Sequence, residues 1–127
     1  MDKKNILYIV IPCYNEQEVL PITAPMFLDK LNSLIAQNLC SEESKVLFVN
    51  DGSKDNTWNI ICSLAKENSK FKGVNLSRNR GHQNALLAGL MYSKDRCDVA
   101  ISIDADGQDD IAAMDDMLKA YKEGCDI

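Results

Sequence analysis

The stretch Lys-Val-Leu-Phe-Val-Asn-Asp-Gly-Ser at residues 45–53 decides the fold class, because an apolar run leads directly into a polar turn there. The four apolar residues 46–49 are typical of a strand buried on both faces, and Gly52 and Ser53 are typical of a turn. Ser53 or Asp55 can cap a helix that follows, in which apolar residues recur at helical spacing: Trp58, Ile61, Cys62 and Ala65. The stretch therefore predicts a strand followed by a helix.

The same strand-then-helix unit recurs along the whole chain. Apolar runs predict strands at residues 5–11, 45–50, 72–76 and 98–103. Helical patterns separate them, with helices expected after Pro21 and Pro25, after Ser53 or Asp55, at 83–93 and at 111–122. This alternation predicts an α/β fold, a Rossmann-like three-layer α/β/α sandwich with a mainly parallel sheet.

Length and charge exclude several classes of protein. The 127 residues suit one domain, and 14 Lys plus Arg against 19 Asp plus Glu give a net charge of −5. This acidic balance, without a dense basic patch, argues against a partner such as a nucleic acid. The longest apolar run, residues 6–11, is too short for a transmembrane segment and ends at Pro12 without a cleavage site.

The cysteines and the chain end indicate where the protein works and how much of it is present. Five cysteines without a C-x-x-C pair indicate reduced thiols and a cytoplasmic location. Residues 124–127 resemble the start of another strand. We therefore expect residues 1–127 to be a single domain and the N-terminal part of a longer protein.

Polar residues follow every predicted strand. In an open α/β sheet, ligands bind outside the carboxyl ends of the strands. The candidate residues are, in order of the strands, Pro12, Tyr14, Asn15 and Glu16; Asp51, Gly52 and Ser53; Arg78, Asn79, Arg80, Gly81 and His82; and Asp104, Ala105, Asp106 and Gln108. The carboxyl edge of the sheet is therefore the predicted site.

Asp104-Ala105-Asp106 is the strongest candidate for metal binding. Two carboxylates one residue apart at a strand end can converge on Mg²⁺ or Mn²⁺, and Mg²⁺ usually completes its coordination with substrate phosphates. A solvated turn is the alternative. Asp109 and Asp110 are better explained by the favourable dipole at the start of the predicted helix.

The other two strand ends leave alternatives open. Asp51 can accept a hydrogen bond from a nucleobase or ribose, or form an Asx-type turn. Arg78 and Arg80 suit phosphate or a base edge, although at least one of them is expected to be only solvated. Gly81 permits close backbone approach. His82, the sole histidine, is more typical of a hydrogen-bonded residue at a helix start than of a catalyst.

Four motifs in register resemble the family 2 glycosyltransferases over the whole chain. They are Ile11-Pro-Cys-Tyr-Asn-Glu16, Val49-Asn-Asp-Gly-Ser-Lys-Asp55, Ser77-Arg-Asn-Arg-Gly-His-Gln83 and Asp104-Ala-Asp-Gly-Gln-Asp109. The last two are most similar to the polyprenyl-phosphate branch, the dolichol-phosphate mannose synthase-like enzymes. Asp110 replaces a proline usual in that branch, and Gly107 a common leucine.

The resemblance implies a GT-A fold whose nucleotide-binding half is this chain. It implies an inverting transfer from a UDP- or GDP-sugar to a polyprenyl phosphate or a glycan, in cell-wall or polysaccharide biosynthesis. Pro12, Tyr14 and Glu16 would line the nucleoside pocket, Asp51 would contact the base, and Arg78 would lie beside the nucleotide. Asp104 and Asp106, with Gln108, would hold Mg²⁺ or Mn²⁺.

Several features are expected outside residues 1–127. In the family's layout, the general base, the acceptor site and any membrane-anchoring segments follow Ile127. The resemblance therefore implies a cytoplasmic protein, placed at the cytoplasmic face of the membrane by segments absent from this chain. Alone, the chain is expected to bind its donor without turning it over.

Other classes of α/β domain fit less well. A phospho-accepting receiver domain requires an acid pair after the first strand and a lysine after the last, and neither is present. A dinucleotide-binding domain requires G-x-G-x-x-G after the first strand, where Pro12-Cys13-Tyr14 stands instead. A non-catalytic nucleotide-binding module stays open as an alternative.

Overall fold

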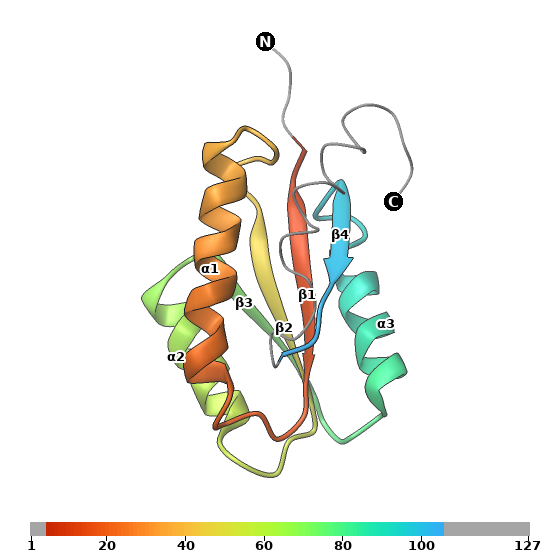
Figure 1. Cartoon of the computed structure of the whole chain (residues 1–127). Coiled ribbons are helices and arrows are strands. Elements are labelled where there is room, and N and C mark those ends of the chain that lie inside the picture. Colours follow the sequence, from red (N-terminus) through yellow and green to blue (C-terminus); the bar gives the residue numbers. More distant parts are fainter. Residues whose placement is uncertain (1–4, 106–127) are drawn as a thin grey trace.

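A computed structural model of the chain describes residues 5–105, which form four strands and three helices in strict alternation (Figure 1). The elements are β1 (Leu7–Cys13), α1 (Leu20–Ala36), β2 (Lys45–Asp51), α2 (Thr57–Glu67), β3 (Phe71–Leu76), α3 (His82–Ser93) and β4 (Val99–Ser102). The predicted order of elements is confirmed over this range. The helix predicted at residues 111–122 lies outside the described residues.

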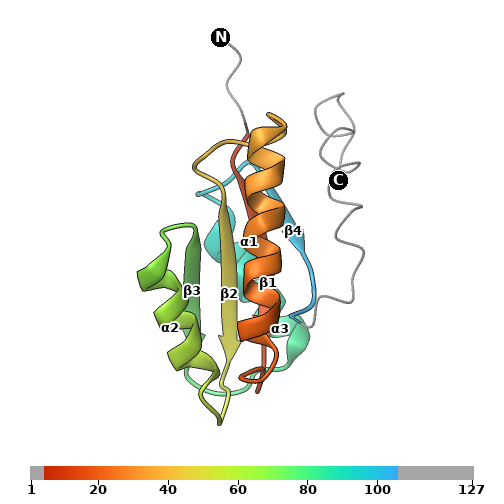
Figure 2. The ribbon, with the colours of Figure 1, turned by 60° about the vertical axis from the view of Figure 1, so that its left-hand side comes forward.

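The strands form one parallel sheet in the order β3-β2-β1-β4. Helices α1 and α2 cover one face and α3 covers the other, which gives the three predicted layers (Figures 1 and 2). Parallel strands require a crossover between them, and a helix fills each crossover here. All carboxyl ends of the strands consequently meet at one edge.

Two apolar clusters, one on each face of the sheet, make up the core. Ile9 and Phe48 point to the α1–α2 side, while Val10 and Leu47 pack on the α3 side. The central strands β1 and β2 therefore bury both faces, which explains their continuous apolar runs. Gly89 of α3 lies against Val10 and Val49, so that this helix approaches the sheet closely.

The start of α2 differs from the prediction. Neither Ser53 nor Asp55 is its N-cap, because the helix begins at Thr57 and Asn56 precedes it without a side-chain cap. Asp55 Oδ1 instead accepts the backbone N–H of Thr57 at 2.9 Å, as in an Asx turn. The Ser53 hydroxyl accepts a bond from another loop. Both residues thus lie before the helix, and neither is its N-cap.

The described cysteines are free thiols, and no helix within residues 5–105 is long and apolar enough to cross a membrane. Cys13 and Cys40 are buried in the core, where they pack as small apolar side chains. Burial, and then the charge of Glu16, raises the pKa of the Cys13 thiol far above its ordinary value. The Cys13 thiol therefore stays protonated and uncharged.

Candidate functional site

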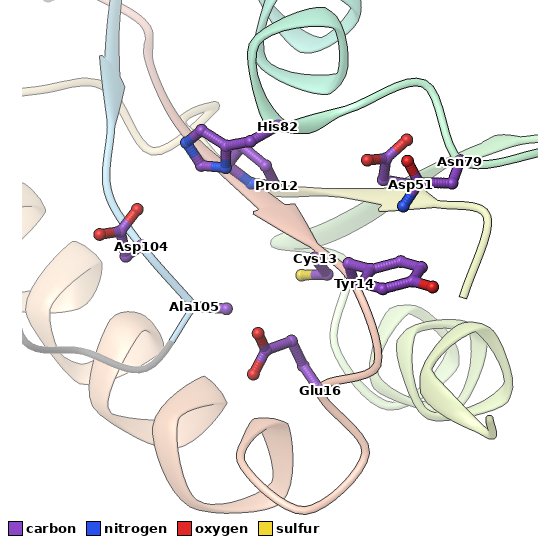
Figure 3. A pocket seen from close by; sticks show the side chains of 9 residues that line it. All are labelled: Pro12, Cys13, Tyr14, Glu16, Asp51, Asn79, His82, Asp104 and Ala105. Carbon is purple, nitrogen blue, oxygen red and sulfur yellow. The ribbon is translucent and has the colours of Figure 1, made fainter. Parts of the chain in front are cut away.

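A cavity of about 260 Å³ opens at the carboxyl edge of the sheet (Figure 3). Its lining comes from the end of β1 and the loop after it, from the end of β2, from the β3–α3 connection and from the segment after β4: Pro12, Cys13, Tyr14, Glu16, Asp51, Asn79, His82, Asp104 and Ala105. The topology thus brings to one place residues that are up to 93 positions apart, Pro12 and Ala105. This is the edge at which the sequence predicts a site.

Most of the predicted site residues that are described lie in this lining. They are Pro12, Tyr14, Glu16, Asp51, His82, Asp104 and Ala105. Asn15, Arg78 and Gly81 are near in sequence but do not line the cavity. Asp106 and Gln108 lie outside the described residues, so their predicted roles as metal ligands stay predictions.

The sequence did not predict Cys13 as a lining residue, and it predicted no role for Asn79. Cys13 was missed because the candidates after the first strand were chosen for their polar side chains, and the cysteines were interpreted only as reduced thiols. In the structure, β1 runs on to Cys13, which lines the cavity. Asn79 was among the candidate residues after the third predicted strand, but no role was assigned to it because the neighbouring arginines were favoured for their charge. The signal for Asn79 is its place between two arginines in a strand-end motif, which a rule based on charge overlooks.

Asn15 joins the loop after β1 to the loop after β2. It has a positive φ of 52°, its N–H donates to Ser53 Oγ at 2.9 Å, and its Oδ1 accepts the N–H of Lys54 at 2.9 Å. Asparagine tolerates this left-handed conformation better than most residues. The position of Asn15 therefore has a structural explanation, and its predicted contact with a ligand stays a prediction.

Thr57 holds Glu16 at the cavity. The Glu16 N–H donates to Thr57 Oγ1 at 2.8 Å, and that hydroxyl in turn donates to Asp55 Oδ1 at 2.5 Å. Thr57 is completely buried. Although desolvation raises it, hydrogen bonds from the Thr57 hydroxyl and from the backbone N–H groups of Thr57, Gln17 and Asp55 itself lower the pKa of Asp55 below its ordinary value. The loop that carries Tyr14 and Glu16 is thus fixed from the start of α2.

The Thr57→Val variant is expected to be about 1–3 kcal/mol less stable, because the nearly isosteric side chain leaves the Glu16 N–H without its acceptor. Urea unfolding measures this loss of free energy. Thr57→Ser is the matched control, since it keeps the hydroxyl and should recover most of the stability. Equal unfolding midpoints for the wild type and Thr57→Val would show that this bond does not hold the loop.

Asp51 is only 3% exposed and makes a bond that is remote in sequence. Its Oδ1 accepts the backbone N–H of Arg80 at 2.6 Å. The turn expected after β2 uses Asn50 instead, whose Oδ1 accepts the N–H of Ser53 at 3.3 Å. The Asp51 carboxylate therefore holds the β3–α3 loop rather than forming an Asx-type turn, and its contact with a nucleobase or ribose stays a prediction. The Asp51 side chain therefore both binds the β3–α3 loop and lines the cavity.

The β3–α3 loop brings His82 to the cavity. Gly81 has a φ of 91°, and its N–H donates to Asn79 Oδ1 at 3.0 Å. His82 follows as the first residue of α3. Arg78 and Arg80 are exposed. The bond from Arg80 to Asp51 uses its backbone and not its guanidinium group.

Three carboxylates and one imidazole line the cavity, those of Glu16, Asp51, Asp104 and His82 (Figure 3). Ala105 is held beside them by its carbonyl, which accepts a bond from Thr23 Oγ1 at 2.8 Å. Such an acidic cavity repels a free anion, whereas a hard divalent cation prefers oxygen ligands of this kind. Within residues 5–105, no three His, Cys, Asp or Glu side chains group as a complete metal centre. The Asp104 carboxylate has the chemistry of one ligand for such a cation, and its predicted role in a metal site stays a prediction.

Comparison with protein families gives a match over almost the whole chain. Residues 8–127 match the model described as glycosyl transferase family 2. The uncharacterized glycosyltransferase YkoT of Bacillus subtilis (strain 168) is 49% identical over 122 residues, which cover 96% of this chain and 36% of that relative. A prophage bactoprenol glucosyl transferase homolog of Escherichia coli (strain K12) is 34% identical over 119 residues, with 94% and 36% covered. The chain thus spans about a third of the length of these curated relatives.

Solved structures show the same fold. Residues 1–349 of S. aureus TarS in complex with UDP superpose with a TM-score of 0.64 at 21% identity, covering 93% of this chain and 32% of that one. The mannosyltransferase PcManGT from Pyrobaculum calidifontis, in complex with GDP-Man and Mn²⁺, gives a TM-score of 0.57 at 22% identity, with 82% and 28% covered. These neighbours are GT-A glycosyltransferases, which confirms the predicted fold.

Proposed function

Because this chain belongs to glycosyl transferase family 2, we propose that it is the donor-binding part of an inverting enzyme that transfers the sugar of a nucleoside-diphosphate sugar to an acceptor and releases the nucleoside diphosphate. One observation carries the proposal: all four strand ends supply residues to a single acidic cavity at the carboxyl edge. The described residues enclose about 260 Å³, less than the 300–1,000 Å³ of usual ligand sites. The size therefore suits one part of a donor better than a whole nucleotide sugar.

The nucleoside is proposed to lie against Pro12, Tyr14 and Asp51. Tyr14 is 40% exposed, which leaves an aromatic face for stacking on a base. The Asp51 carboxylate is suited to accept a hydrogen bond from a base N–H or a ribose hydroxyl. A UDP-bound and a GDP-Man-bound neighbour of the same fold support a nucleotide in this region.

A divalent cation, Mg²⁺ or Mn²⁺, is proposed to bind at Asp104, with Asp106 and Gln108 as further ligands. The acidic lining supports this assignment, because a diphosphate enters a cavity of carboxylates only when a cation offsets their repulsion. When bound, the cation stabilises negative charge on the departing nucleoside diphosphate as a Lewis acid. Asp104 would orient the cation, and Ala105, held by Thr23, would keep the Asp104 backbone in place.

The acceptor is proposed to be a polyprenyl phosphate. The similarity to a protein named as a bactoprenol glucosyl transferase homolog supports a lipid phosphate. A phosphate oxygen is already anionic and needs little help from a general base, whereas a hydroxyl of a glycan acceptor would need a carboxylate. With a lipid acceptor, the enzyme would work at the cytoplasmic face of a membrane, in cell-wall or polysaccharide synthesis.

Calorimetric titration with UDP, GDP and their common sugar conjugates tests the proposal. We expect one nucleotide to bind with Mn²⁺ and to bind at least tenfold more weakly after addition of EDTA. Equal affinity in both conditions would contradict the metal assignment, and no binding to the folded chain would contradict a self-sufficient donor site. Nucleotide binding without sugar transfer, in a protein of the relatives' length, would favour a non-catalytic nucleotide-binding module.

A further inference from the structure

We propose that Gly52 is a positioning residue for the donor cavity: its close packing against the β3–α3 loop sets the wall formed by Asn79 and His82. The inference deepens the proposed function and rests on it. Gly52 itself does not line the cavity. It acts through the backbone of the loop that does.

Gly52 has no room for a side chain. A Cβ atom at this position would overlap the backbone of Arg78 and Asn79. The obstacle is main chain, which cannot rotate away as the end of a flexible side chain can. Gly52 also has a φ of 65°, a conformation that L side chains rarely adopt. The turn after β2 and the β3–α3 loop are therefore in direct backbone contact.

The adjacent residue provides the second tie to the same loop. Asp51 Oδ1 accepts the Arg80 N–H at 2.6 Å, across 29 positions of sequence. Within residues 5–105, the other side-chain hydrogen bonds of this loop are local, from Gly81 N–H to Asn79 and from Asn84 to the Arg80 carbonyl. Asp51 and Gly52 together therefore hold the loop against the end of β2.

The loop position matters because the loop supplies one wall of the cavity. Figure 3 shows Asn79 beside Asp51, and His82 on the side of the cavity that leads toward Asp104. Among the described lining residues, His82 alone can carry a positive charge. The wall consequently borders both the Asp51 end proposed for the base and the path proposed for the diphosphate. A shift of the Arg78–Asn79 backbone would move this wall away from the cavity. The contacts with the base and with the diphosphate would both be weakened.

The test compares two glycine variants by nucleotide titration with Mn²⁺ and by thermal unfolding. Gly52→Ala pushes the loop away from β2 and should lower the affinity for the nucleotide that the wild type binds, UDP or GDP, at least tenfold. Gly73→Ala is the matched control, since its Cβ would crowd Ile61 and Trp58 on the α2 side, away from the cavity. We expect both variants to unfold at lower temperature, and Gly73→Ala to keep its affinity within twofold. Affinities within twofold for a folded Gly52→Ala, or an equal loss in Gly73→Ala, would overturn the proposal.

Amide hydrogen exchange of the wild-type chain provides a measurement that needs neither a folded variant nor a bound nucleotide. The Arg80 amide should exchange at least tenfold more slowly than the Arg78 amide, because it donates to the nearly buried Asp51 carboxylate. Equal exchange rates would overturn the proposal even if nucleotide binding is confirmed. A slow Arg80 amide in a chain that binds no nucleotide would instead place the failure in the proposed function.

Discussion

The Asp104→Asn variant is expected to bind a nucleoside diphosphate about 100-fold more weakly in the presence of Mn²⁺, equivalent to about 3 kcal/mol of binding free energy. The carboxylate of Asp104 lines the acidic cavity at the end of β4. An amide has nearly the same shape but no charge, and it is a poor ligand for a hard cation. Titration with and without EDTA measures the effect, and the same loss is expected for Asp106→Asn.

Asp95→Asn is the matched control for this prediction. Asp95 is an exposed residue after α3, it does not line the cavity, and its replacement changes the net charge by the same amount. We expect this variant to bind as the wild type does, and all variants to unfold at similar temperatures. If Asp104→Asn retained its Mn²⁺-dependent affinity, the cation would have to bind elsewhere.

The fold was predictable because strands that are buried on both faces have continuous apolar sequences. Residues 46–49 form a continuous apolar run because β2 lies between β1 and β3 with helices on both faces. Element boundaries were less predictable. Helix α2 starts at Thr57, whose N–H donates to Asp55 in an Asx turn, while the Ser53 hydroxyl accepts the N–H of Asn15 from another loop. Tertiary contacts of this kind override a local capping pattern.

The candidate site was predictable as far as the topology alone determines it. A parallel sheet brings all strand ends to one edge, so polar residues after the strands converge there, including Glu16 and Asp104. The hydrogen-bond partner of each of these neighbouring polar residues was not predictable. Asn50 stabilises the turn after β2, Asn15 joins two loops, and Asp51 reaches a loop 29 residues away. Those roles depend on backbone positions that short-range patterns do not contain.

The role of Gly52 shows the same limit. The pattern Asp51-Gly52-Ser53 indicates a turn, and the positive φ of Gly52 agrees with that. The contact with the Arg78–Asn79 backbone follows only once β3 is placed next to β2. Gly52 thus serves the local turn and also sets the distance between two loops of the cavity.

The Asp51→Ala variant is expected to bind the nucleotide about 100-fold more weakly, equivalent to about 3 kcal/mol, because it loses two interactions of a charged hydrogen-bond acceptor. One is the proposed contact with the base, and the other is the bond to Arg80, which places the cavity wall. Asp51→Asn keeps an oxygen that can accept the Arg80 N–H, so its loss should be about tenfold.

Two comparisons separate a base contact from a metal effect and from general damage. Replacing a residue that contacts the base should weaken nucleotide binding by the same factor with Mn²⁺ and with EDTA. Asp104→Asn should weaken nucleotide binding only with Mn²⁺. Asp98→Ala is the matched control, since Asp98 Oδ2 also accepts a backbone N–H, that of Ile6 at 2.8 Å, near the opposite ends of the strands. This control should keep its affinity. If Asp51→Ala bound as tightly as the wild type, Asp51 would have no part in nucleotide recognition, and the position of the Asn79–His82 wall would not limit affinity.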